Sequence, residues 1–192
     1  MVDMSQRDRE FCNQALAYLK RALPKDESDP AKIELSLEDS PVLTDLNNGL
    51  MAAYLVDAAD RYQYVQNGHL ARADLTQAEL HRLGVANLLA LFERRSLRIE
   101  AFGNCFAVLC GGDFEASALL IDTFWDEGLA ALAPNGFIAA VPCRDILAFC
   151  DAANPYGLEE LRQLIERARN ADHPISSALY RRSAAAWELY LD

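Results

Sequence analysis

Residues 41–92 carry the clearest pattern of hydrophobic and polar positions, and it predicts two strands followed by a helix. Residues 50–56 form an apolar run and residues 62–65 alternate apolar with polar side chains, which together indicate an antiparallel hairpin. Thr76 and Glu79 stand three residues apart, so each side chain can bond to the other residue's backbone N–H as a capping box. Apolar residues then recur near helical spacing, at Leu80, Leu83, Leu88 and Phe92. We therefore expect a helix that begins directly after Thr76.

The first 40 residues predict an amphipathic helix, a loop and a half-exposed strand. The helix should end before Pro24, with an apolar face made of Phe11, Ala15, Tyr18, Leu19 and Ala22. Residues 24–31 contain two prolines and three acidic residues, a composition typical of a loop. After this loop, apolar and polar residues alternate as in an edge strand, with Ile33, Leu35 and Leu37 on the apolar side.

Two further hairpins are expected in the second half of the chain. Gly103-Asn104 forms a two-residue turn between strand patterns at residues 97–102 and 105–110. Residues 179–180 should pair with residues 187–191, in which apolar and polar side chains again alternate.

Between these hairpins the sequence predicts two central strands and a helix. Uncharged runs at residues 137–141 and 146–150 suit the interior of a sheet. Asn154 and Pro155 match a helix cap followed by a first-turn proline, so a helix should run from there to about residue 170. The segment from Glu115 is ambiguous, because it fits either one helix or a strand over 116–121 and then a helix capped by Asp122; we favour the strand.

These elements predict an α+β fold, with a mainly antiparallel sheet flanked by helices and an N-terminal amphipathic helix. A chain of 192 residues fits one domain, in which residues 1–31 form the N-terminal helix and loop and residues 32–192 form the α+β core.

Several ordered segments resemble the YtpQ family, bacterial proteins of unassigned biochemical function. The segments are PVLTDLNNGLMAAYLVD, QAELHRLGVANL, GGDFEASALLIDTFWDE and AVPCRDILAFCDAANPYGLEELRQLI. The resemblance runs from about residue 41 to the C-terminus and includes no catalytic signature. It therefore implies a family of uncharacterised bacterial proteins and assigns no functional residue.

The charge balance is strongly acidic, with 29 acidic against 18 basic side chains and a formal net charge of −11. Nucleic-acid binding needs clustered Lys and Arg, so nucleic acid is not an expected partner. Charged residues interrupt each apolar run before it reaches the ~18 residues of a membrane span, and the N-terminus lacks the apolar middle of a signal peptide. We therefore expect a cytoplasmic protein without membrane contact.

The cysteines and polar motifs predict neither a metal site nor a cofactor. Five cysteines lie mostly in apolar runs without a CxxC pair, which is typical of buried reduced thiols and argues against zinc. Gly111-Gly112 lacks the Lys and Ser/Thr of a phosphate loop, and Asp113 with Glu115 does not continue into a calcium loop. Ser117 lacks the flanking glycines of a catalytic nucleophile.

Arg144-Asp145 is the most suggestive polar pair, because it lies between two apolar strands. Held there, a guanidinium and a carboxylate could recognise an anion or a partner's backbone. A turn with a mutually compensated ion pair explains the same residues, and we favour this structural interpretation.

The leading functional hypothesis is a non-enzymatic module that binds another protein through an acidic surface, with a basic protein as the candidate partner. The outer face of the helix after Asn154, with Glu159, Glu160 and Glu166, is one candidate surface. One concrete form is an immunity-type protein that neutralises a bacterial toxin, since an acidic face would speed association with a basic active-site rim. The alternative is an enzyme with a site assembled around Arg144 and Asp145.

Overall fold

The computed structural model describes residues 4–22, 35–58, 61–184 and 186–191. The chain divides into two compact units, Met1–Ala90 and Leu91–Asp192. Each unit contains an antiparallel sheet and at least one helix packed on it, which confirms the α+β class. The single domain expected from the length stays a prediction.

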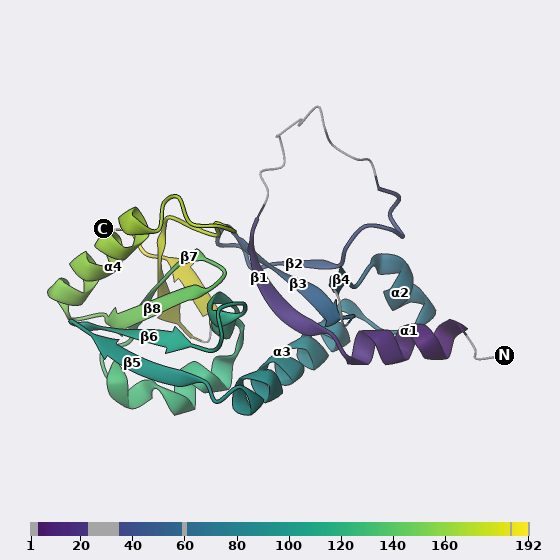
Figure 1. Ribbon diagram of the computed structural model, residues 1–192, viewed down its shortest axis with the longest axis horizontal. Coiled ribbons are helices and arrows are strands. Elements are labelled where there is room, and N and C mark those ends of the chain that lie inside the picture. The colour runs from purple at the N-terminus through teal and green to yellow at the C-terminus, as the bar shows by residue number, and fades with distance from the viewer. Residues whose placement is uncertain (1–3, 23–34, 59–60, 185, 192) are drawn as a thin grey trace. The chain divides into compact units, whose positions relative to one another are not determined.

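The sheet of the first unit is built around β3 (Leu50–Asp57), as Figure 1 shows. Strand β1 (Leu16–Arg21) pairs with one edge of β3. The short strands β2 (Leu43–Asp45) and β4 (Tyr62–Tyr64) pair with its other edge. All three pairings are antiparallel, and the hairpin expected from the apolar run at 50–56 is confirmed as β3 and β4.

The N-terminal helix is shorter than expected, because the second half of the predicted helix is strand β1. Helix α1 spans Met4–Asn13. From Leu16 the backbone pairs with all six residues from Leu50 to Leu55 of β3. Leu19, which belongs to the predicted apolar face, is buried, and so is Ala17, which does not; both are buried as residues of β1. Pairing with β3 therefore determines the conformation of this segment, although its apolar residues recur at helical spacing.

Two helices complete the first unit. Helix α2 (Asn67–Arg72) lies against α1, with the rings of Phe11 and His69 4.8 Å apart. The long helix α3 (Gln77–Arg94) begins with the predicted capping box: the backbone N–H of Glu79 donates to Thr76 Oγ1 at 3.2 Å, and that of Thr76 donates to the Glu79 carboxylate at 2.8 Å. The boundary between the two units falls within α3.

The strand predicted around Ile33, Leu35 and Leu37 is wrong for Leu35 and Leu37, which lie in a turn region and not in a strand. Ile33 lies outside the described residues. The Ser36 hydroxyl accepts the backbone N–H of Asp39 at 3.1 Å, and the Ser36 carbonyl accepts that of Ser40 at 3.0 Å. These bonds close a turn, because the Ser side chain competes with sheet pairing for backbone donors. Leu37 is consequently 81% exposed.

The sheet of the second unit has six strands in the order β10-β9-β7-β8-β6-β5, all antiparallel. The predicted hairpin around Gly103-Asn104 is formed by β5 (Arg98–Phe102) and β6 (Cys105–Leu109). The closing hairpin is formed by β9 (Leu179–Ser183) and β10 (Ala186–Leu189). The two uncharged runs are confirmed as the central strands β7 (Phe137–Cys143) and β8 (Ile146–Asp151).

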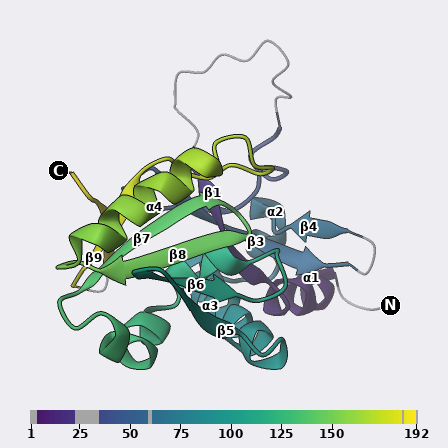
Figure 2. The same cartoon turned by 60° about the vertical axis from the view of Figure 1, so that its left-hand side comes forward.

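Helix α4 (Pro155–Arg167) lies along β7 and β8 on one face of this sheet (Figure 2). The predicted cap is confirmed, because the Asn154 side chain accepts the backbone N–H groups of Tyr156 and Gly157. Beneath the helix lies a core of small and aliphatic side chains: Cys105, Ile138, Ala140, Ala148, Cys150, Leu161, Ile165 and Leu179. Gly157 allows α4 to lie close to β8, since a Cβ at this position would lie 2.7 Å from the Cβ of Cys150.

An irregular helical segment covers the opposite face of the sheet and corrects the favoured strand at 116–121. It contains a 3₁₀ helix (Glu115–Leu120), a π-helical turn (Phe124–Gly128) and a short 3₁₀ helix (Ala130–Leu132). Trp125 is fully buried, with its ring 5.3 Å from that of Phe149 on β8. Residues 115–120 are all buried, so apolar content alone could not separate a buried strand from a buried helix.

Candidate functional site

Arg144 lies in the turn between β7 and β8, and its guanidinium faces Asp113 rather than Asp145. Nη2 of Arg144 lies 3.8 Å from Oδ1 of Asp113. Arg95, the residue directly after α3, approaches the other carboxylate oxygen, with Nη1 3.8 Å from Oδ2. We call Arg95, Asp113 and Arg144 the Asp113 cluster. It brings together two cations from distant parts of the sequence around one carboxylate.

The loop that carries Asp113 is fixed by a buried glutamate. Glu115 is 2% exposed, and its carboxylate accepts backbone N–H groups from Cys110 at 2.8 Å, Gly112 at 2.7 Å and Phe114 at 3.1 Å. Such charge-assisted bonds compensate the cost of burying the carboxylate. The Gly-Gly pair is required because Gly111 and Gly112 have φ angles of +95° and +90°.

Asp145 is exposed and is directed to a neighbouring thiol. Burial and hydrogen bonding to Asp145 raise the pKa of the Cys143 thiol to about 12. Cys143 is fully buried, so its thiol is neutral at physiological pH and is not a nucleophile. The structure therefore separates the two members of the predicted Arg144-Asp145 pair into different contacts.

The three predicted acids of α4 lie on a face of mixed charge. Glu159 and Glu166 are paired with Arg162 at 4.0 Å and Arg169 at 2.6 Å. Glu160 has a structural contact: it accepts the backbone and side-chain N–H groups of Asn104, both at 2.7 Å, in the turn between β5 and β6. These bonds from Asn104 hold the pKa of Glu160 below its usual value. Whether the three acids also bind a partner stays a proposal.

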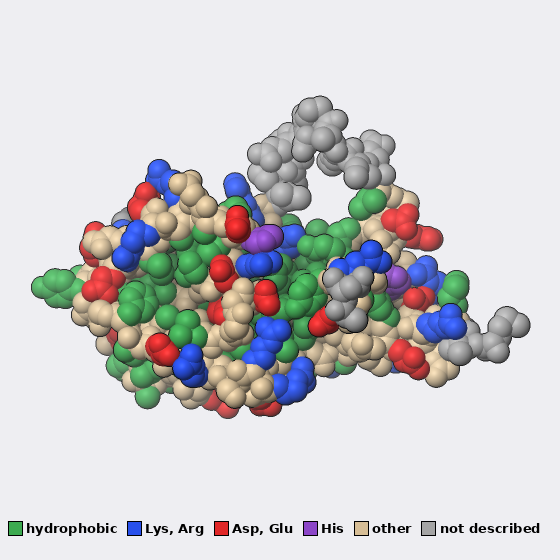
Figure 3. All heavy atoms as spheres, in the orientation of Figure 1, with side chains coloured by type: hydrophobic (Ala, Val, Ile, Leu, Met, Phe, Trp, Pro, Cys, Tyr) green, Lys and Arg blue, Asp and Glu red, His purple; other side chains and the backbone are tan. Residues whose placement is uncertain are grey.

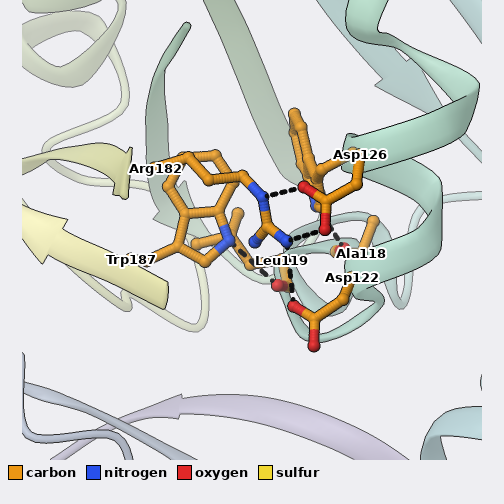
Figure 4. Close-up of polar contacts among 7 residues, drawn as sticks. Ala118, Leu119, Asp122, Asp126, Arg182 and Trp187 are labelled. Carbon is orange, nitrogen blue, oxygen red and sulfur yellow. Dashed lines mark hydrogen bonds and ion pairs between the residues drawn. The ribbon is translucent and has the colours of Figure 1, made fainter. Parts of the chain in front are cut away.

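A second arginine cluster, absent from the sequence-based expectations, joins the closing hairpin to the irregular helical segment (Figure 4). Arg182 on β9 donates from Nε and Nη2 to the two oxygens of Asp126, at 2.8 and 2.9 Å, and from Nη2 to Asp122 at 3.1 Å. Its guanidinium lies over the ring of Trp187, 5.6 Å from the ring centre. We call these four residues the Arg182 cluster.

The first unit presents a half-exposed apolar face on the side of its sheet opposite α3. Gly84 of α3 lies close to Ala17 and Tyr54, which identifies the covered face. Because neighbouring residues of a strand alternate between faces, Leu43, Tyr62 and Tyr64 point to the other face. They are 39%, 42% and 38% exposed. Figure 3 shows hydrophobic side chains gathered over the strands of this sheet. We call this surface the β-face.

Three further observations bear on the expectations from the sequence. In the part of the chain that the structure describes, no group of three or more His, Cys, Asp or Glu side chains could hold a metal ion. All five cysteines are buried, and hydrogen bonding to Cys150 together with burial raises the pKa of Cys105. No helix among the described residues has the length and apolar character needed to cross a bilayer.

Comparison with known proteins gives a partial likeness to a bacterial protein. No protein-family model matches the chain, and no solved structure matches it. The chain is 27% identical over 112 residues to a UPF0354 protein of Halalkalibacterium halodurans. The match covers 58% of this chain and 42% of that protein, so the chain spans less than half of its relative. The likeness supports relation to an uncharacterised bacterial family, and the finer resemblance to the YtpQ family stays a prediction.

Proposed function

We propose that the chain is a non-enzymatic module that binds a basic protein partner through the β-face. The observation that carries this proposal is a half-exposed aromatic surface bordered by carboxylates. Register places Asp45 beside Met51 at one end of the β-face and Asp57 opposite Tyr62 at the other, and both aspartates are exposed. Tyr and Met are enriched in protein interfaces, where an apolar centre is surrounded by a polar rim.

The charge of the chain supports a basic partner. The net charge of −11 attracts a cationic protein over distances up to the Debye length and speeds diffusional encounter. Lys20 lies on the same face, where its Nζ donates to the Tyr64 hydroxyl at 2.7 Å, and the carboxylates of Asp45 and Asp57 outnumber its single positive charge. An immunity-type protein that neutralises a basic toxin is one concrete form of the proposal.

Affinity capture followed by kinetics tests this function. We expect a basic bacterial protein to be retained by the wild-type chain and lost from a Tyr62→Ser/Tyr64→Ser double variant. Tyr156→Ser is the matched control, since Tyr156 is a 73% exposed tyrosine on α4. With the purified partner, association should slow as salt rises from about 50 to about 500 mM, because the Debye length shortens to a few ångströms.

Two results would contradict the proposal: equal retention of the partner by all three chains, or an association rate insensitive to salt. The alternative, an enzyme built around Arg144 and Asp145, would need both side chains on one substrate. Arg144 instead faces Asp113, and Asp145 bonds to Cys143. Turnover of a small substrate that is lost in Arg144→Ala would nonetheless replace the binding proposal with the enzyme.

A further inference from the structure

The Asp113 cluster leaves two guanidinium groups with unused hydrogen-bonding capacity. Each guanidinium carries five N–H donors in a planar fork. Both contacts to Asp113 are 3.8 Å long, whereas a charge-assisted hydrogen bond measures about 2.7–2.9 Å. Among the described residues, neither guanidinium donates a hydrogen bond to a protein acceptor. The two side chains are 34% and 35% exposed, so a ligand can reach them.

These donors are held in place by the surrounding structure. The guanidinium of Arg95 lies over the ring of Phe114, which is 1% exposed. The backbone of Arg144 is fixed at both ends, because its N–H donates to the carbonyl of His173 at 3.3 Å and its carbonyl accepts the N–H of Ala116 at 3.1 Å. The Arg95 side chain and the Arg144 backbone therefore need little reorganisation when a ligand binds, which lowers the cost of binding.

The loop beside the arginines leaves room for a ligand. A Cβ added at Gly112 would have no atom within 4 Å, so the backbone borders open space there. A Cβ added at Gly111 would lie 3.6 Å from Nη1 of Arg95, which places this open loop directly next to the guanidinium.

The charge count selects the class of ligand. The two arginines contribute two positive charges, and Asp113 is the carboxylate that approaches both of them, because the nearby Glu115 carboxylate bonds to backbone N–H groups of the loop. A dianion can replace this monoanion between the guanidinium groups and balance both charges, whereas a monocarboxylate has no advantage over Asp113 itself. The planar forks of arginine also match the oxygens of a phosphate group.

We infer that Arg95 and Arg144 form a binding site for a phosphate dianion, either inorganic phosphate or a phosphate monoester, for which Asp113 is an intramolecular competitor. This site is separate from the proposed protein-binding surface and does not depend on it. Removal of the competing carboxylate should strengthen binding, while removal of either guanidinium should weaken it.

Calorimetric titration of the full chain with inorganic phosphate, glycerol phosphate and acetate at low salt tests the inference. We expect the two phosphates to bind and acetate to bind at least about tenfold more weakly, which is ~1.4 kcal/mol. Asp113→Asn should tighten phosphate binding about tenfold, and Arg144→Gln or Arg95→Gln should weaken it by at least as much. Comparison of the two phosphates shows which form the site prefers.

Arg162→Gln is the matched control, because Arg162 is a 40% exposed arginine on α4 paired with a carboxylate at 4.0 Å. It should leave phosphate affinity unchanged, and circular dichroism of each variant checks that it is folded. Equal affinity in wild type, Asp113→Asn and Arg144→Gln would overturn the inference. So would an equal loss in Arg162→Gln and Arg144→Gln, because binding would then follow overall charge.

Discussion

The two arginine clusters of the second unit use the same side chain in opposite ways. Arg182 is 5% exposed and donates three hydrogen bonds of 2.8–3.1 Å to two carboxylates. Arg95 and Arg144 are about one-third exposed and share one carboxylate at 3.8 Å. Burial and short bonds to carboxylates therefore distinguish Arg182, although its Nη1 is buried without a hydrogen-bond partner, from the two arginines that a ligand can reach.

The largest expected effect is the loss of stability in Arg182→Gln. We expect the free energy of unfolding to fall by about 2 kcal/mol, because a buried charge-assisted network is lost while the half-exposed aspartates keep their hydration. Urea unfolding measures the change. Arg181→Gln is the control, since the neighbouring Arg181 is exposed and should change stability by less than about 0.5 kcal/mol. Equal losses of stability in Arg182→Gln and Arg181→Gln would show that the Arg182 cluster stabilises the fold no more than an exposed arginine does.

The same variant tests whether the chain unfolds as the single domain predicted from its length. If residues 1–192 form one cooperative domain, Arg182→Gln should shift a single calorimetric transition of the whole chain. Two transitions, of which only one moves, would instead assign the Arg182 cluster to a separately folding second unit and contradict the single-domain prediction.

A smaller effect is expected on the pH dependence of stability. Hydrogen bonding to Arg182 holds the pKa of Asp126 below its ordinary value. A carboxylate with a depressed pKa in the folded state stabilises the protein above its unfolded pKa of about 3.9, and this stabilisation is lost as pH falls through the folded pKa. The stability difference between wild type and Arg182→Gln should therefore shrink between about pH 6 and pH 2. Urea unfolding across this range checks the trend, and a constant difference would show that Asp126 does not contribute.

The smallest effect is expected for the arginines of the Asp113 cluster. Arg144→Gln and Arg95→Gln should each change the free energy of unfolding by less than about 0.5 kcal/mol, because long contacts between partly exposed charges contribute little. Thermal unfolding without phosphate measures this. A loss as large as that of Arg182→Gln would mean that the Asp113 cluster is also structural.

Local signals predicted much of the fold correctly from the sequence. The capping box of Thr76 and Glu79, the turn at Gly103-Asn104 and the cap at Asn154 all depend on residues close together in the chain. Strand β1 could not be predicted in the same way, because its conformation depends on pairing with residues of β3 that lie 29 to 39 positions further along the chain.

The candidate site shows the same limit. The position of Arg144 between two apolar strands marks it as a candidate in the sequence, but its guanidinium lies against Asp113 and not against the adjacent Asp145. Its actual neighbours, Asp113 and Arg95, are brought to it by the Gly-Gly loop and the end of α3. Spacing in one sequence contains no signal for such long-range contacts. The unused donors of Arg95 and Arg144 are visible only once the distances are known.

Thermal unfolding with and without inorganic phosphate tests the contrast between the two clusters most directly. At phosphate about tenfold above its dissociation constant, ligand linkage should add ~1.4 kcal/mol and raise the Tm of wild type by about 3 °C. Arg182→Gln should unfold at a lower temperature yet keep this rise, whereas Arg144→Gln should unfold near the wild-type temperature and lose it. An equal rise in all three proteins, or a rise lost only in Arg182→Gln, would contradict the account.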